Sequence, residues 1–229
     1  MNNLVFLKLG GSLITDKNSP RTAREDLILR VCREISQTLY DDSQIKLLLG
    51  HGSGSFGHFS GKKHNTREGV STPEEWQGFD EVRQDAAALN QLVMDGLNKA
   101  NLPAVVFPPS GSVTAENRKI TNWDHSPIFS AFDKNLLPVI YGDVVFDTEL
   151  GGTILSTEEL FLHLAGELKP GRILLAGIDQ GVWEDYPACR KLIREINPAN
   201  YPLILKNINS SGSPDVTGGM AAKVSQMVV

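Results

Sequence analysis

The stretch LVFLKLGGS, residues 4–12, decides the fold class of this chain. Apolar residues surround a single lysine, Lys8, and two glycines and a serine follow. A short apolar run closed by glycines is typical of a buried strand that ends in a tight turn. A charged side chain inside such a run is unusual, which makes Lys8 a candidate functional residue.

Segments of the same strand-like kind recur along the chain and alternate with helical patterns. Apolar residues at helical spacing predict helices through residues 27–39 and 79–97, and Thr72-Pro73-Glu74-Glu75 has the sequence of a capping box. Thr22 and Ser156 begin two further candidate boxes. Such alternation predicts an α/β fold with a mostly parallel sheet. The other predicted strands span 45–49, 104–107, 138–141 and 172–176, and 207–215 is predicted to be a loop.

Composition narrows the class of protein. The chain has 229 residues, with 22 Lys and Arg against 27 Asp and Glu, so its net charge is −5. An acidic chain is not expected to bind nucleic acid. Since no apolar stretch approaches the roughly 20 residues of a membrane span and the N-terminus lacks the pattern of a signal peptide, we expect a cytoplasmic protein without a membrane partner. Cys32 and Cys189 form no metal-binding pattern, so we expect two reduced thiols.

Two predicted strands end in glycine-rich turns, at residues 8–12 and 50–58. Glycine lets backbone N–H groups approach an anion closely, and a following helix adds the positive end of its dipole. Because the carboxyl ends of parallel strands meet at one edge of a sheet, the two turns would face each other across a crevice. This arrangement suits two phosphate-bearing ligands held head to head. The alternative is that both are packing turns.

Other known patterns fit less well. Residues 52–57 match the dinucleotide fingerprint Gly-x-Gly-x-x-Gly, but the acidic residue expected about 20 positions later is not seen. The Walker A pattern is absent, and so is the nucleophile elbow of serine hydrolases.

Several motifs resemble those of a known family. The segments KLGGS (8–12), TDK (15–17) and DVTGGM (215–220) with Lys223 resemble the amino acid kinase superfamily. GSGSFGH (52–58) is similar to the glycine motif of isopentenyl phosphate kinases, and YGDVV (141–145) and GTILS (152–156) also resemble that family. The ordered set covers essentially the whole chain. The resemblance implies an αβα sandwich and a single domain over 1–229, with an acceptor lobe at 1–150 and a nucleotide lobe at 151–229.

The resemblance also implies a reaction in isoprenoid biosynthesis, in the mevalonate pathway. ATP, with Mg²⁺ on its phosphates, would phosphorylate isopentenyl phosphate to isopentenyl diphosphate. The acceptor is a phosphate whose second pKa is about 6, so it is mostly a dianion at pH 7 and needs no strong general base. What it needs is charge neutralisation and in-line positioning. The family further implies a homodimer.

Family roles carry over to matching positions. The catalytic group comprises Lys8 and Lys17 near the transferred phosphoryl group, His58 on the acceptor phosphate, and Asp143, which would organise the lysines. On the nucleotide side the matches are, besides Lys8, Gly10, Gly11, Ser12, Asp179, Thr217, Gly218 and Lys223. The acceptor side comprises Gly52, Ser53, Gly54, Gly57, His58 and Gly152, with Phe79 and Val82 doubling as core and tail pocket. We expect structural roles for His51, His64, His125 and His163.

The chain also departs from the family pattern. Ser53 stands where a glycine is usual, and it would be strained if that position needs a positive φ. Ser156-Thr157-Glu158-Glu159 replaces the more common Ser-Gly-Asp-Asp, and Gln180 is an extra residue in a nucleotide-side motif. The chain also stops at Val229, where the family continues through further strands, so the nucleotide lobe is expected to be truncated.

Three other functions are consistent with parts of the sequence. A kinase for another small phosphate or phosphonate, such as fosfomycin, shares a histidine after the glycine turn, and a polar pocket behind His58 would favour it. A dinucleotide-binding oxidoreductase would rest on the glycine fingerprint alone. A non-catalytic nucleotide sensor is disfavoured by the lysines and His58.

Overall fold

The computed structural model describes residues 3–185, 188–209 and 224. The chain divides into two compact units, of which the first ends at Ala176 and the second begins at Gly177. Residues 151–176 thus lie in the first unit, and the functional boundary expected at residue 150 stays a prediction.

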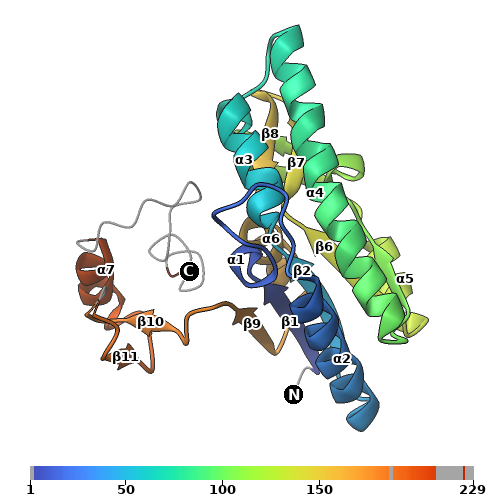
Figure 1. Cartoon of the computed structure of the whole chain (residues 1–229), viewed down its shortest axis with the longest axis vertical. Coiled ribbons are helices and arrows are strands. Elements are labelled where there is room, and N and C mark those ends of the chain that lie inside the picture. The colour runs from blue at the N-terminus through green and yellow to red at the C-terminus, as the bar shows by residue number, and fades with distance from the viewer. Residues whose placement is uncertain (1–2, 186–187, 210–223, 225–229) are drawn as a thin grey trace. The chain divides into compact units, whose positions relative to one another are not determined.

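A five-stranded parallel sheet forms the centre of the first unit (Figure 1). Its order is β3-β6-β2-β1-β9, so the first two strands of the chain lie side by side in the middle. The predicted strands are confirmed, with small shifts at their ends. Their bounds are β1 (Leu4–Leu9), β2 (Lys46–His51), β3 (Ala104–Val106), β6 (Leu137–Tyr141) and β9 (Arg172–Ala176).

The alternation of side chains along these strands builds two cores, one on each face. Phe6, Leu48 and Ile140 pack in a cluster with α5 (Ser126–Asp133) and α6 (Thr157–Leu168). On the same strands, Leu9, Leu49 and Val139 pack in another cluster with α2 (Glu25–Asp41) and α4 (Pro73–Lys99). Because successive side chains of a strand point to opposite faces, helices cover both sides of the sheet. The expected αβα sandwich is confirmed.

A second, four-stranded sheet stands beside the first. Its order is β5-β4-β7-β8. Each outer strand is antiparallel to its inner neighbour, and the two inner strands are parallel. The buried carboxylate of Asp147 accepts hydrogen bonds from four backbone N–H groups and so ties two of its turns together. The strands are β4 (Val113–Glu116), β5 (Lys119–Trp123), β7 (Asp143–Asp147) and β8 (Gly151–Leu155).

Two of the three predicted capping boxes are confirmed. Thr72 and Glu75 cap α4, and Ser156 and Glu159 cap α6, in both cases with reciprocal hydrogen bonds. The third is wrong, because α2 begins at Glu25 with Arg24 as its N-cap and without a side-chain cap. The hydroxyl of Thr22 instead donates to the carbonyl of Pro20, so the loop uses it locally.

Most of the glycine-rich segment after β2 is helical, so the turn is shorter than the sequence predicts. After Gly52 and Ser53 the chain enters α3 (Gly54–His64), which is followed by a short 3₁₀ helix, η1 (Thr66–Glu68). A four-residue helix, α1 (Gly11–Ile14), likewise follows β1, and η2 (Pro109–Gly111) follows β3. Glycines that look like loop residues therefore form helices.

Among its described residues, the second unit contains a short antiparallel pair and a helix of nine residues. These are β10 (Val182–Trp183), β11 (Leu192–Ile193) and α7 (Tyr201–Asn209). The loop predicted over 207–215 is wrong at its start, because residues 207–209 end α7; the rest lies outside the described residues. Both cysteines are free thiols, and burial raises the pKa of Cys32 to about 11. None of the described helices has the length and apolarity needed to cross a membrane.

Candidate active site

The two glycine turns touch each other at the carboxyl ends of β1 and β2. A Cβ placed on Gly11 would lie 2.6 Å from the Cα of Gly54, and one placed on Gly52 would lie 3.1 Å from the backbone nitrogen of Gly11. Gly54 also has a φ of 50°, in the left-handed region that favours glycine. Side chains at these positions would push the turns apart, so the glycines are what allows the two backbones to meet.

Lys8 lies at the carboxyl end of β1, beside the second turn. Its Cε is 3.9 Å from the position of a Cβ on Gly52, and the residue is only 7% exposed. Its ammonium group forms an ion pair with Glu158, which is equally buried in the first turn of α6. A buried cation needs such a partner, and the carboxylate holds the ammonium group in one place.

His51 has the structural role that we expect for it. Its ring is fully buried, stacks on Tyr141 and lies with Nε2 3.2 Å from Oδ1 of Asn90 on α4. Its carbonyl accepts a hydrogen bond of 2.6 Å from the hydroxyl of Thr157. Burial lowers the pKa of this imidazole, with a smaller contribution from the nearby charge of Lys8. His51 thus joins β2 to α4 and α6 at the residue that directly precedes the second glycine turn.

Asp143 begins β7, one residue after the carboxyl end of β6. Its carboxylate accepts hydrogen bonds from the backbone N–H groups of Ser110, at 3.2 Å, and Val144, at 2.9 Å. Burial raises its pKa to about 6 in spite of these hydrogen bonds. A raised pKa is typical of functional carboxylates. Asp143 is expected to organise the lysines, but the carboxylate that forms the ion pair with Lys8 is that of Glu158.

Helix α3 carries three of the predicted acceptor residues, Gly54, Gly57 and His58. Ser53 is its N-cap with φ −71°, so the strain that a positive φ would impose there does not arise; Gly54 takes the positive φ instead. A Cβ on Gly57 would lie 2.8 Å from that of Ser53, so this glycine makes room for the serine. His58 lies half-buried one turn into the helix, whose N-terminus is favourable for an anion.

An apolar cluster lies next to α3 and α4. Phe79, Val82 and Val144 are buried in it, and a Cβ on Gly152 would lie 2.8 Å from the ring of Phe79. The rings of Trp76 and the half-exposed Phe146 contact that of Phe79 at the edge of the cluster, the first in a T-shaped arrangement and the second tilted. The structure thus brings together three of the residues predicted for the acceptor side.

The remaining predicted residues are more scattered. Ser12 lies half-buried on α1 after Gly10, and Lys17 is exposed in the loop between α1 and α2. Asp179 is exposed in the second unit. Thr217, Gly218 and Lys223 lie outside the described residues.

Sequence reasoning missed three contacts that shape the site. The most important is the ion pair of Glu158 with Lys8. The sequence could have indicated Glu158, because it lies in the first turn of a capped helix that follows a glycine motif. Thr15 bonds both turns, because its hydroxyl donates to the carbonyl of Gly11 and accepts from the N–H of Ser55. Asn90 is a polar residue inside an apolar helical stripe, and such an interruption is itself a signal of a buried polar partner.

The fold and the facing glycine turns agree with the sequence match, which places residues 3–229 in the amino acid kinase family. The isopentenyl phosphate kinase of Methanocaldococcus jannaschii is 37% identical over 96% of this chain and 85% of the relative. The enzyme of that name from Methanothermobacter thermautotrophicus is 30% identical over 99% of this chain and 86% of the relative. The chain belongs to the isopentenyl phosphate kinases of this family, as its motifs indicate.

Solved structures agree with this assignment. A crystal structure of an isopentenyl phosphate kinase matches with a TM-score of 0.76 and 29% identity, over 91% of this chain and 88% of that one. The product complex of the Thermoplasma acidophilum enzyme matches with a TM-score of 0.75 and 25% identity, over 97% and 87%. The aspartate kinase of Synechocystis, at 14% identity and a TM-score of 0.68, shares the fold.

Proposed function

We propose that this chain transfers the γ-phosphoryl group of ATP to isopentenyl phosphate, giving isopentenyl diphosphate and ADP. The observation that carries the proposal is the contact between the two glycine turns, with the buried Lys8 beside it. Two phosphate groups bound at these turns would meet end to end, as an in-line transfer between phosphates requires.

We assign the charge chemistry to Lys8. The transferred group spreads negative charge over its oxygens, and an ammonium group fixed before the reaction stabilises that charge without reorganisation. Glu158 fixes it in this structure. The backbone N–H group of Gly11 would bind the ATP phosphates, with Ser12 beside it, and Lys17 would act on the transferred group from its loop. The N–H of Gly10 donates to the carbonyl of Ala176 at 2.8 Å, so Gly10 would shape the turn rather than bind the nucleotide.

The acceptor phosphate would bind at the N-terminus of α3. Gly54 would donate a backbone hydrogen bond and His58 a charge-assisted one, while Gly52, Ser53 and Gly57 shape the turn and Gly152 contributes from β8. A dianionic phosphate attacks without first losing a proton, so no side chain need act as a strong base. On the nucleotide side we assign Asp179, Thr217, Gly218 and Lys223.

The apolar cluster around Phe79 and Val82 favours a hydrocarbon tail over the small polar body of fosfomycin. Each CH₂ group buried there would contribute about 0.8 kcal/mol. Trp76 and Phe146 lie at the edge of the cluster, so the tail would meet aromatic rings.

The nucleotide is proposed to bring Mg²⁺ with it. Magnesium binds preferentially through phosphate oxygens, waters and one or two carboxylates, and it neutralises the developing charge. We further propose a cytoplasmic homodimer.

The direct test is ADP release with Mg·ATP and isopentenyl phosphate, beside dimethylallyl phosphate and fosfomycin. Rapid turnover of the two isoprenoid phosphates and none of fosfomycin is the expected result. Turnover of fosfomycin alone would favour the phosphonate kinase instead. Protection against thermal unfolding by NAD but not by ATP would favour the oxidoreductase.

The first variant to measure is His58→Ala. We expect turnover to fall by at least tenfold and ATP protection against thermal unfolding to stay unchanged, because His58 would bind only the acceptor. His64→Ala is the matched control, since His64 lies on the same helix and bonds Glu81 instead, at 2.6 Å. Equal turnover in the two variants would remove His58 from the mechanism.

A further inference from the structure

The chain between α1 and α2, residues 15–24, forms a small hairpin that we call the strap. Thr15 and Ala23 pair in an antiparallel bridge at its base, and the N–H of Asp16 donates to the carbonyl of Thr22. Lys17 lies exposed in the strap beyond this bridge. The position of Lys17 therefore depends on how the base of the strap is fixed.

Backbone contacts attach the strap to the beginning of α3. The N–H of Arg21 donates to the carbonyl of Ser55 at 3.2 Å, and the N–H of Thr22 donates to the hydroxyl of Ser55 at the same distance. The N–H of Ser55 in turn donates to Thr15. The strap thus lies against the helical turn that begins at Gly54.

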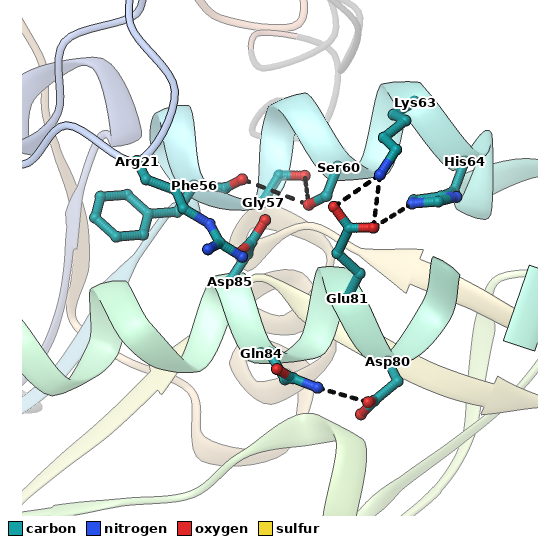
Figure 2. A network of polar contacts seen from close by, with 10 residues as sticks. All are labelled: Arg21, Phe56, Gly57, Ser60, Lys63, His64, Asp80, Glu81, Gln84 and Asp85. Carbon is teal, nitrogen blue, oxygen red and sulfur yellow. Dashed lines mark hydrogen bonds and ion pairs between the residues drawn. The ribbon is translucent and has the colours of Figure 1, made fainter. Parts of the chain in front are cut away.

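One ion pair links the strap to α4 as well. The guanidinium group of Arg21 reaches the carboxylate of Asp85, and Figure 2 shows the two side chains facing each other beside α3. Arg21 is 60% exposed, whereas Asp85 is 4% exposed. Asp85 lies on the face of α4 that also carries the buried Val82 and Ala86. Arg21 also has a φ of 49°, a conformation that a non-glycine residue adopts at a cost.

A buried carboxylate and a strained backbone residue are both unfavourable alone, so their pairing calls for an explanation. A neighbouring ion pair shows the contrast. Lys63 on α3 and Glu81 on α4 join these two helices at 2.8 Å, but their side chains are 61% and 38% exposed and neither belongs to the strap. An ion pair can therefore join α3 and α4 without a buried charge, so helix packing does not explain why Asp85 is buried.

We propose that Arg21 and Asp85 form a latch that holds the strap, and with it Lys17, against the first turn of α3. They are positioning residues. The inference rests on the proposed function, in which Lys17 acts on the transferred phosphoryl group. The latch residues lie away from His58, because Phe56, Phe59, Ser60 and Lys63 line the hollow of about 250 Å³ beside the latch. Helical spacing places His58 on the opposite face of α3.

The test separates positioning from stability. Arg21→Ala leaves the Asp85 carboxylate buried without its partner, so it should lower both the Tm and kcat. The double variant Arg21→Ala with Asp85→Asn removes that stranded charge. We expect it to recover most of the Tm while kcat stays at least tenfold below the wild type and the KM for ATP changes less than threefold, because the strap is still unlatched. Arg21→Lys should restore part of kcat.

Lys63→Ala is the matched control and should keep wild-type kcat. Hydrogen exchange gives a readout that does not depend on the reaction: the amides of residues 16–19 should exchange faster in the double variant and not in Lys63→Ala. A double variant with kcat within twofold of the wild type, or with unchanged exchange in the strap, overturns the latch. An inactive wild type with faster strap exchange in the double variant would instead overturn the proposed function, and the strap would still depend on the latch.

Discussion

At the scale of single residues, the site depends on charged groups that the fold removes from water. Lys8 and Glu158 are each buried and each has the other as a partner. Removing one member of a buried pair is costly because the other stays charged without compensation. Their burial therefore couples the stability of the protein to the position of the proposed catalytic ammonium group.

The variant Glu158→Gln tests this coupling. We expect the free energy of unfolding to fall by about 3–5 kcal/mol, as for other broken buried pairs, and kcat to fall more than the KM for ATP rises. Urea denaturation and steady-state kinetics measure the two effects. The neighbouring Glu159→Gln is the control, since Glu159 caps α6 and pairs with Arg67. If both variants lose kcat equally, Glu158 has no special relation to Lys8.

Asp143 makes a prediction about pH. Its pKa is about 6 in the folded protein and 3.8 as the ordinary value, so the folded state binds a proton more tightly than the unfolded state. Its contribution to stability is therefore full below about pH 4 and is lost as the pH rises through 6, a loss of the order of 3 kcal/mol. Asp143→Asn should gain stability relative to the wild type between pH 4 and 7. A constant difference in unfolding free energy over that range would show that Asp143 titrates normally.

At the scale of elements, the glycines of α3 serve close packing. Gly54 combines a left-handed φ with the contact to Gly11, so the approach of the two turns depends on the absence of a side chain. This is why a helix here has the composition of a loop. The close approach of the two turns and the start of α3 therefore depend on the same glycine.

Substitution of Gly54 by alanine should therefore be severe. The new methyl group would lie 2.9 Å from the carbonyl oxygen of Gly11, and we expect a Tm loss of at least 5 °C together with weaker binding of both phosphates. Gly166→Ala on α6 is the control, because a Cβ there meets nothing within 4 Å and alanine favours helix by up to about 1 kcal/mol. Thermal unfolding compares them, and equal behaviour of the two variants would contradict the packing argument.

At the scale of the whole molecule, the first unit is organised around strands that are covered on both faces. β1, β2 and β6 carry apolar residues toward two separate helical layers, and their carboxyl ends carry the site. A rigid centre of this kind holds the two turns in register. The capped helices α4 and α6 supply the layers and, through Glu158, a site residue.

We expect native-state hydrogen exchange to follow this organisation. Amides in the middle of β1, β2 and β6 should be the slowest to exchange, because only the largest openings of the unit expose them. The strap should exchange orders of magnitude faster. Mass spectrometry of peptides covering residues 4–9, 46–51 and 137–141 checks this, and faster exchange in these strands than in α3 would contradict it.

The sequence by itself determined the five strands of the parallel sheet, the main helices, two of their caps and the family, but not the strands of the second sheet. These features depend on local pattern, since alternation, helical spacing and capping boxes are read within a few neighbours. It also singled out Lys8 and the glycine turns. It did not predict that the second turn continues as α3. A glycine that is needed for close packing cannot be told from the sequence apart from a glycine that is needed for a turn.

Only the tertiary structure decided which charges meet. Glu158 reaches Lys8 from a helix that begins about 150 residues later in the chain, and Asp85 on α4 pairs with Arg21 in the strap. Asn90 meets His51 in the same way. Local sequence can mark one member of such a pair but not its partner, because the distance between two buried groups is set by the packing of the sheet and its helices.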